Sequence, residues 1–205
     1  MNYVYQGYFG ALRMSGGYFQ FQAPQIKVLP VCKISFSTSE KVIKESVQRV
    51  VDFYCSNKIE DILDWINSEL LSNRNDTVHG FLAFLAQQMI EMKERKNNEI
   101  KGFLKWLENE IGTEIDLLTN KTVIKKYYDL EFRDVLDILK ANKSKIAFDP
   151  SNRNKQEMLE ENFNKSLAII SPLKKKILET DKLIDQVVYK LYSLTEEEIK
   201  IVEGK

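Results

Sequence analysis

The side chains that most often carry catalysis are few in this sequence and far apart. His79 is the single histidine, and Cys32 and Cys55 are the two cysteines. One imidazole and two distant thiols cannot complete a tetrahedral zinc site without carboxylates. No candidate base lies near Cys32 in the sequence. We therefore expect His79, Cys32 and Cys55 to have structural or surface roles.

Two charged patterns could carry chemistry, and both are better explained by helix surfaces. Glu-x-Lys triplets begin at Glu91, Glu94, Glu99 and Glu198. Nucleases use such a triplet, usually on a strand, to hold a metal and position a water. Here every triplet falls in a predicted helix of a chain that is 29% charged, which favours chance occurrence. We interpret the run 174–176, three lysines, as a solvated helix face, with a phosphate clamp as the alternative.

The composition excludes several classes of protein. The 205 residues carry 30 basic and 30 acidic side chains, so the chain does not coat nucleic acid through bulk charge. It has no glycine-rich phosphate loop, which excludes an encoded nucleotide cradle. It has no apolar run of membrane-spanning length and no secretory signal pattern, so we expect no membrane contact. Two cysteines make a reduced, cytoplasmic setting the expected one.

Charge and aromatic residues are unevenly distributed along the chain. Residues 1–37 contain no Asp or Glu, and Arg13, Lys27 and Lys33 give them a net charge of +3. The same stretch holds eight of the 22 aromatic residues. We therefore divide the chain into a short β-rich segment, residues 1–36, and a helical region, residues 37–205.

The β-rich segment is too short to form a sheet by itself. Residues 3–9 and 18–22 read as strands separated by a glycine turn. In the second strand Phe19 and Phe21 share one face, while Tyr18 and Gln20 lie on the other. The aromatic face needs cover from another chain or from the helices that follow. It is either a hydrophobic hairpin packed on the helical core or a nucleic-acid surface rich in aromatic and basic residues.

Apolar periodicity predicts helices through the rest of the chain. The first runs from a capping box at 37–40 to about Tyr54, and the second covers 58–71. Further helices are expected at 131–146, 153–180 and 182–192, and a capping box at 195–198 begins a terminal helix. Pro172 should kink or interrupt the helix that contains it, and Asp181 should cap the next one. The apolar positions assigned to the first helix are Val42, Ile43, Val47, Val50, Val51 and Tyr54.

The longest predicted helix, about 77–111 with Asp76 as its cap, has a coiled-coil pattern. Its apolar residues follow alternating spacings of four and three from Val78 to Leu107, with one polar break at Lys96. Such a helix would be about 50 Å long, which suits a spacer or a coiled-coil arm. The predicted fold is therefore mainly α: a multi-helix bundle with one long coiled-coil-like helix and a short β-rich N-terminal segment.

Two sequence motifs resemble parts of restriction-modification enzymes. The run Gly16-Gly17-Tyr18-Phe19-Gln20-Phe21, followed by Gln25-Ile26-Lys27-Val28-Leu29-Pro30, looks like the closing segment of a target-recognition domain of type I specificity subunits and fused type IIG enzymes. Residues 184–199 resemble the I-D-x-L-V-Y-x-L-Y-G-L-T-E-E-E-I tail of their DNA methyltransferases, with Ser193 in place of the glycine. Residues 81–92 look like the helical insert of the same group.

The catalytic motifs of that group are missing here. Its adenine methyltransferases use an N-P-P-[YF] or D-P-P-[YF] motif and a glycine-rich loop for S-adenosylmethionine, whereas Asp149-Pro150 is followed by Ser151 and no such loop exists. The resemblance thus implies the C-terminal target-recognition and helical region of an adenine-specific enzyme. The cofactor would belong to the missing domain, and this chain would hold none. The chain would then be a split gene product, a remnant or a cloned piece.

The resemblance implies a non-catalytic function in DNA recognition and spacing. Its partners would be double-stranded DNA and a methyltransferase catalytic domain or subunit. Arg13, Lys27 and Lys33 are the expected phosphate contacts, and Tyr18 and Gln20 belong to the expected exposed face. The alternative is a stand-alone helical interaction or oligomerisation module without DNA binding, which pairs or self-associates through the seam of the long helix.

Overall fold

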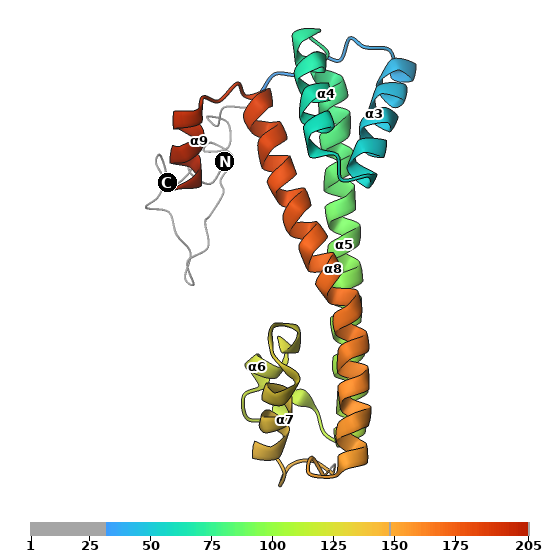
Figure 1. Cartoon of the computed structure of the whole chain (residues 1–205), viewed down its shortest axis with the longest axis vertical. Helices are drawn as coiled ribbons and strands as arrows, with labels where there is room; N and C mark the ends of the chain where they lie inside the picture. Colours follow the sequence, from blue (N-terminus) through green and yellow to red (C-terminus); the bar gives the residue numbers. More distant parts are fainter. Residues whose placement is uncertain (1–31, 148, 205) are drawn as a thin grey trace, which may run out of the picture. The chain divides into compact units, whose positions relative to one another are not determined.

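The computed structural model describes residues 32–147 and 149–204, which are mainly α-helical (Figure 1). These ranges contain seven α-helices, two 3-10 turns and no strand. The prediction of a mainly helical protein is confirmed. The two strands predicted at 3–9 and 18–22 lie outside the described residues, and residues 32–39 lead into the first helix without regular structure.

The chain divides into two compact units, which we describe separately. Unit 1 is Met1–Ala83 with Ile184–Lys205, and unit 2 is Phe84–Leu183. The described part of unit 1 contains α3 (Glu40–Cys55), α4 (Ile59–Leu71), the start of α5 (Asn75–Ile111), the end of α8 (Arg153–Leu191) and α9 (Glu196–Glu203). The described part of unit 2 contains the rest of α5 and α8, with η1 (Ile115–Leu117), α6 (Lys121–Ile124), η2 (Tyr127–Asp129) and α7 (Phe132–Ala141) between them.

In unit 1, α3 and α4 pack on the first turns of α5 (Figure 1). The Trp65 ring of α4 lies edge-on to Phe81 of α5, with 5.8 Å between centroids. Gly80 allows the closest approach of α3, because a Cβ atom at this position would lie 3.1 Å from Cγ2 of Val47. Among the described residues of this unit, the buried apolar side chains are Val50, Tyr54, Ile62, Trp65, Ile66, Val78, Phe81 and Val187.

The start of α3 corrects two predictions. Ser39 is the N-cap and makes no side-chain cap bond, so the predicted box at 37–40 does not form. The Ser37 N–H that the box requires is bound to Asp76 instead, and Glu40 pairs with Lys44 at 2.8 Å. Val42, expected to face inward, is 38% exposed.

The long helix α5 confirms the prediction of a helix at 77–111, with a start two residues earlier at Asn75. Asp76 therefore lies in the first turn and is not the cap. Along the predicted seam, Val78, Leu85, Met89, Met92, Phe103 and Leu107 are buried. The seam is covered within this chain in unit 2, because Phe103 and Leu107 belong to a buried cluster that includes Phe163 of α8.

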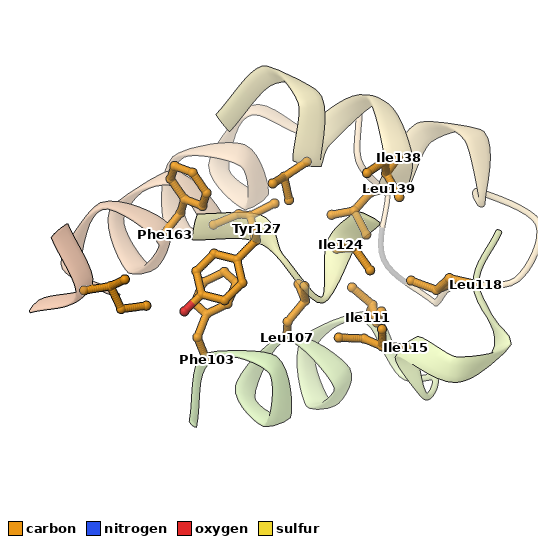
Figure 2. Close-up of a cluster of buried hydrophobic side chains, with 13 residues drawn as sticks. Phe103, Leu107, Ile111, Ile115, Leu118, Ile124, Tyr127, Ile138, Leu139 and Phe163 are labelled. Carbon is orange, nitrogen blue, oxygen red and sulfur yellow. The ribbon is translucent and has the colours of Figure 1, made fainter. Parts of the chain in front are cut away.

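Figure 2 shows this cluster, the core of unit 2. Side chains from α5 and α8 meet side chains from the short elements between them. Tyr127 stacks on Phe103 with 4.1 Å between ring centroids, and Ile115 and Ile124 are fully or almost fully buried. Three single-turn elements thus contribute the centre of the core, although no helix was predicted between 112 and 130.

The helix predicted at 131–146 is shorter in the structure. α7 ends at Ala141, and buried Asn142 follows as its C-cap. The Asn142 amide nitrogen donates to the Ile138 carbonyl at 2.9 Å, and its oxygen accepts from the Thr119 N–H at 2.8 Å. The Asn142 side chain thus joins the last turn of α7 to the loop around Thr119. Its place as the C-cap accounts for the end of the helix at Ala141.

α8 runs as one helix from Arg153 to Leu191, so Pro172 does not interrupt it and Asp181 does not cap a separate helix. Proline removes the bond to the Ala168 carbonyl, but Pro172 and Ala168 are both exposed, so water can satisfy that carbonyl. Buried Ile170 and Leu173 hold the helix on either side. Packing on both sides of Pro172 therefore keeps the helix continuous.

The end of the chain confirms the last predicted capping box. The Thr195 hydroxyl accepts from the Glu198 N–H, and the Glu198 carboxylate accepts from the Thr195 N–H at 2.8 Å. Ser193, just before it, has a φ of +52°. Over the described residues, no helix combines the length and the apolar character that crossing a membrane requires.

Candidate nucleic-acid interface

Residues 32–38 of unit 1, which include the end of the acid-free stretch, are hydrogen-bonded at both ends to other parts of the same unit. At one end the Cys32 N–H donates to the Tyr192 hydroxyl at 3.0 Å, and the Cys32 thiol lies 3.8 Å from the Leu191 carbonyl oxygen. At the other end Ser37 and Thr38 bind Asp76. The segment is thus tied to the end of α8 and to the start of α5.

Asp76 is the stronger of these two attachments. Its carboxylate is 2% exposed and accepts from the N–H groups of Ser37, Thr38 and Thr77 and from the Thr38 hydroxyl, at 2.8 to 3.0 Å. Burial by itself would raise the pKa of Asp76, but the bonds from Thr38, Ser37 and Thr77 together lower it below its usual value. Asp76 is therefore held as a charged acceptor.

Lys33 and Phe36 are exposed on this tethered segment. Lys33 lies next to the Cys32 attachment, and its side chain is open to solvent. Phe36 is 72% exposed, and its ring lies perpendicular to the imidazole of His79 with 5.5 Å between centroids. His79 is itself exposed, as expected for a surface histidine. A cation and an aromatic ring are thus presented on one fixed stretch of backbone.

Lys33 is the one predicted site residue that the structure describes. Arg13, Tyr18, Gln20 and Lys27 lie outside the described residues. Sequence reasoning did not single out Phe36 or His79 as neighbours, because 43 positions separate them and neither belongs to a motif. Cys32 and Cys55 are both free cysteines.

A buried polar network fixes the connection between α4 and α5. Asp76 lies directly after this connection, in the first turn of α5. Glu69 is 4% exposed, and its Oε1 accepts from the Ser46 hydroxyl and from Nη2 of Arg74, while Oε2 accepts from the Thr77 hydroxyl. Arg74 Nε lies 2.9 Å from Oε2, at ion-pair distance but outside hydrogen-bond geometry. Trp65 donates to the Ser46 hydroxyl at 3.1 Å. The network holds three helices in register without offering a reactive group to solvent.

The described part of unit 2 contains a buried hydroxyl pair and a hollow on its surface. Tyr127 OH and Ser166 Oγ lie 2.6 Å apart in the core. Burial raises the pKa of Tyr127 to about 12, with the Ser166 bond acting in the opposite direction. The hollow, of about 300 Å³, is bordered by residues of α5 and α8 that include Trp106, Lys165 and Ser166. A phenol with such a raised pKa stays protonated near neutral pH and is not poised as a base.

The described residues do not assemble a metal centre. Within 32–147 and 149–204, no group of three His, Cys, Asp or Glu side chains is arranged to hold a metal ion. The triplet at Glu91 lies on α5, where that carboxylate accepts from Gln87 and Gln88.

Comparison with known proteins identifies a family for the helical body. Residues 75–188, more than half of the chain, match the family described as Domain of unknown function (DUF8810). The chain belongs to this family. The match begins at the first residue of α5 and ends three residues before α8 does, so the DUF8810 region contains all of unit 2. No curated protein and no solved structure matches the chain.

Proposed function

We propose that this chain is the non-catalytic DNA-recognition and spacer portion of a restriction-modification DNA methyltransferase specific for adenine. In this proposal it acts in the cytoplasm with a catalytic domain or subunit that holds S-adenosylmethionine. The residues before α3 contribute to recognition of double-stranded DNA, and the DUF8810 helices act as the spacer.

The observation that carries the proposal is the conformation of Ser193. It occupies the place of the glycine in the methyltransferase tail that residues 184–199 resemble, and its φ of +52° lies in the left-handed region that favours glycine. The Leu194 N–H donates to the Tyr189 carbonyl and the Ser193 N–H to the Lys190 carbonyl, as in a glycine-terminated helix end. A left-handed backbone at Ser193 is the conformation that a glycine in this place would adopt without strain, and this supports the resemblance.

The helices support a spacer role. α5 has 37 residues and α8 has 39, and the core of unit 2 fixes the two against each other through side chains such as Phe103 and Phe163. Fixed long helices can set a constant separation between modules. In unit 1 the hydrogen bonds to Asp76 attach residues 32–38 to the start of α5.

Duplex binding by the full chain tests the proposal. The variant Arg13→Gln, Lys27→Gln, Lys33→Gln removes the three predicted phosphate contacts. We expect weaker binding and a slope of log affinity against log salt that is shallower by about 2.7, because each lost phosphate contact removes about 0.9. A matched control, Lys101→Gln, Lys182→Gln, Lys200→Gln, removes the same charge from exposed positions on α5, α8 and α9. Wild-type protein that binds no duplex at low salt would refute autonomous recognition.

The second candidate is a helical interaction module without DNA binding. Ile90 of α5 and Leu178 of α8 are 52% and 56% exposed, as on helices that pair with another chain. The seam residues Phe103 and Leu107 are already covered inside unit 2, so pairing would use other faces. Sedimentation equilibrium with and without duplex DNA distinguishes the two candidates. A chain whose molar mass shows self-association, and does not increase when duplex is added, favours the interaction module.

A further inference from the structure

Two lysines of unit 2 lie over one tyrosine ring. Nζ of Lys96, from α5, lies 5.8 Å from the centroid of the Tyr128 ring, and Nζ of Lys174, from α8, lies 5.4 Å from it. The two ammonium groups are therefore no more than about 11 Å apart. Lys96 is the polar break in the apolar seam of α5, and Lys174 begins the lysine run 174–176.

Positive charge exceeds negative charge at this place. Lys174 forms an ion pair with Asp129, the residue after Tyr128. Lys96 has no ion pair with any carboxylate of the described residues. Exposed Lys93 lies one turn before Lys96 on α5, a spacing that puts both on one helix face. Glu99 lies one turn after Lys96 on α5, so two carboxylates, Asp129 and Glu99, accompany the three cations Lys93, Lys96 and Lys174. The remaining excess of one positive charge is open to an anion from solvent.

The tyrosine ring holds the cations in place. The face of an aromatic ring attracts ammonium groups, and here it attracts two from different helices. Tyr128 is itself fixed, because its ring packs edge-on against fully buried Tyr127 at 5.7 Å between centroids. Holding lysine side chains before a ligand arrives reduces the conformational entropy lost on binding.

We propose that Lys96, Tyr128 and Lys174 form a phosphate-binding surface that contacts the backbone of double-stranded DNA. This inference rests on the proposed function and extends it, since it gives the spacer a second, sequence-independent hold on the duplex. A duplex strand carries one phosphate per roughly 3.4 Å of helix axis, so two ammonium groups that lie within about 11 Å of each other can reach the same or neighbouring phosphates. Lysine is a point-like phosphate contact that tolerates variation in the groups it meets.

The test is duplex binding by the full chain over a series of salt concentrations. The variant Lys96→Gln, Lys174→Gln removes both cations. We expect about 10-fold weaker binding at low salt and a slope of log affinity against log salt that is shallower by about 1.8. The control Lys101→Gln, Lys182→Gln removes the same charge from exposed positions on the same two helices and should leave the slope within about 0.5 of the wild-type value.

Each outcome supports or overturns the inference. If the test variant behaves like its control while Arg13→Gln, Lys27→Gln, Lys33→Gln weakens binding, the surface is refuted and the proposed function stands. If wild-type protein binds no duplex, both are refuted. If affinity falls without a change of slope, the lysines do not contact phosphates and the inference is refuted. A melting temperature equal to that of the control shows that the double variant is folded.

Discussion

Thr38 donates two hydrogen bonds to Asp76, one from its N–H to Oδ2 and one from its hydroxyl to Oδ1, each 2.8 Å long. Ser37 adds a third bond, from its N–H to Oδ2 at 3.0 Å. Because Asp76 lies in the first turn of α5, these bonds connect the residues before α3 to the first helix of the DUF8810 region. The contact lies within unit 1 and positions Lys33 and Phe36.

The first prediction concerns this carboxylate. Asp76→Asn keeps one acceptor oxygen and replaces the other with a donor that faces donors. We expect a loss of about 1–3 kcal/mol in the free energy of unfolding at pH 7, measured by denaturant titration. Asp64→Asn, the same change at an exposed position on α4, should alter stability by less than about 0.5 kcal/mol.

The wild type and the Asp76→Asn variant can also be compared as a function of pH. The pKa of Asp76 is lowered in the folded state from its usual value of 3.8, so its contribution is complete above that value and disappears as the pH falls through the lowered pKa. The stability difference between wild type and Asp76→Asn should be constant from pH 5 to pH 7 and shrink below about pH 4. A difference that grows on acidification would contradict the assigned hydrogen bonds.

The second prediction compares two glycines of α5. Gly102→Ala should stabilise the protein by about 1 kcal/mol, because alanine favours helix and nothing lies within 4 Å of the new Cβ. Gly80→Ala gains the same propensity but puts its Cβ 3.1 Å from Cγ2 of Val47, so we expect a net loss of about 1 kcal/mol. Denaturant unfolding of both variants measures the difference.

Val47→Ala provides the control for this contact. It removes the methyl group that the Cβ introduced by Gly80→Ala would meet, so Gly80→Ala should be less harmful in a Val47→Ala background than in the wild type. Equal effects of Gly80→Ala in the two backgrounds would mean that α3 and α5 are not in tight contact at this point.

The third prediction concerns the end of α8. Ser193 has a φ of +52°, which costs a residue with a Cβ atom free energy that glycine does not lose. Ser193→Gly should therefore raise the free energy of unfolding by about 0.5–1 kcal/mol. Ser171→Gly, inside α8, should lower it by about 0.5 kcal/mol. Destabilisation by both changes would show that Ser193 does not need the left-handed conformation.

Periodicity predicted the long elements because each repeats its apolar pattern over many turns. The helix expected at 77–111 is Asn75–Ile111, and that expected at 58–71 is Ile59–Leu71. The pattern could not find η1, α6 or η2, whose three or four residues are shorter than one repeat. Tyr127 lies in such a turn, and its full burial comes from Phe103 and Phe163, which are distant in sequence.

The polar contacts of the candidate interface were less accessible to sequence reasoning. Asp76 was assigned to a local cap, but its partners Ser37 and Thr38 lie 38 and more positions away. Ser46 is buried by Glu69 and Trp65, whereas Val42, an apolar residue on the same helix, is exposed. A rule that sorts residues by type alone cannot find a buried hydroxyl with partners on other helices.

The last prediction concerns Pro172, which does not interrupt α8. α8 passes through this proline, so the structure tolerates the missing N–H and the contact of the ring with the preceding turn. Pro172→Ala should restore the bond to the Ala168 carbonyl and raise the free energy of unfolding by about 1–3 kcal/mol, because the position is exposed and alanine fits there. The comparison is Ser171→Ala at the neighbouring exposed position, which changes helix propensity by only about 0.5 kcal/mol. A Pro172→Ala variant that is as stable as the wild type, or less stable, in denaturant titration would contradict this prediction. It would mean that the backbone at this turn of α8 does not form the hydrogen bond from residue 172 to the Ala168 carbonyl when proline is replaced.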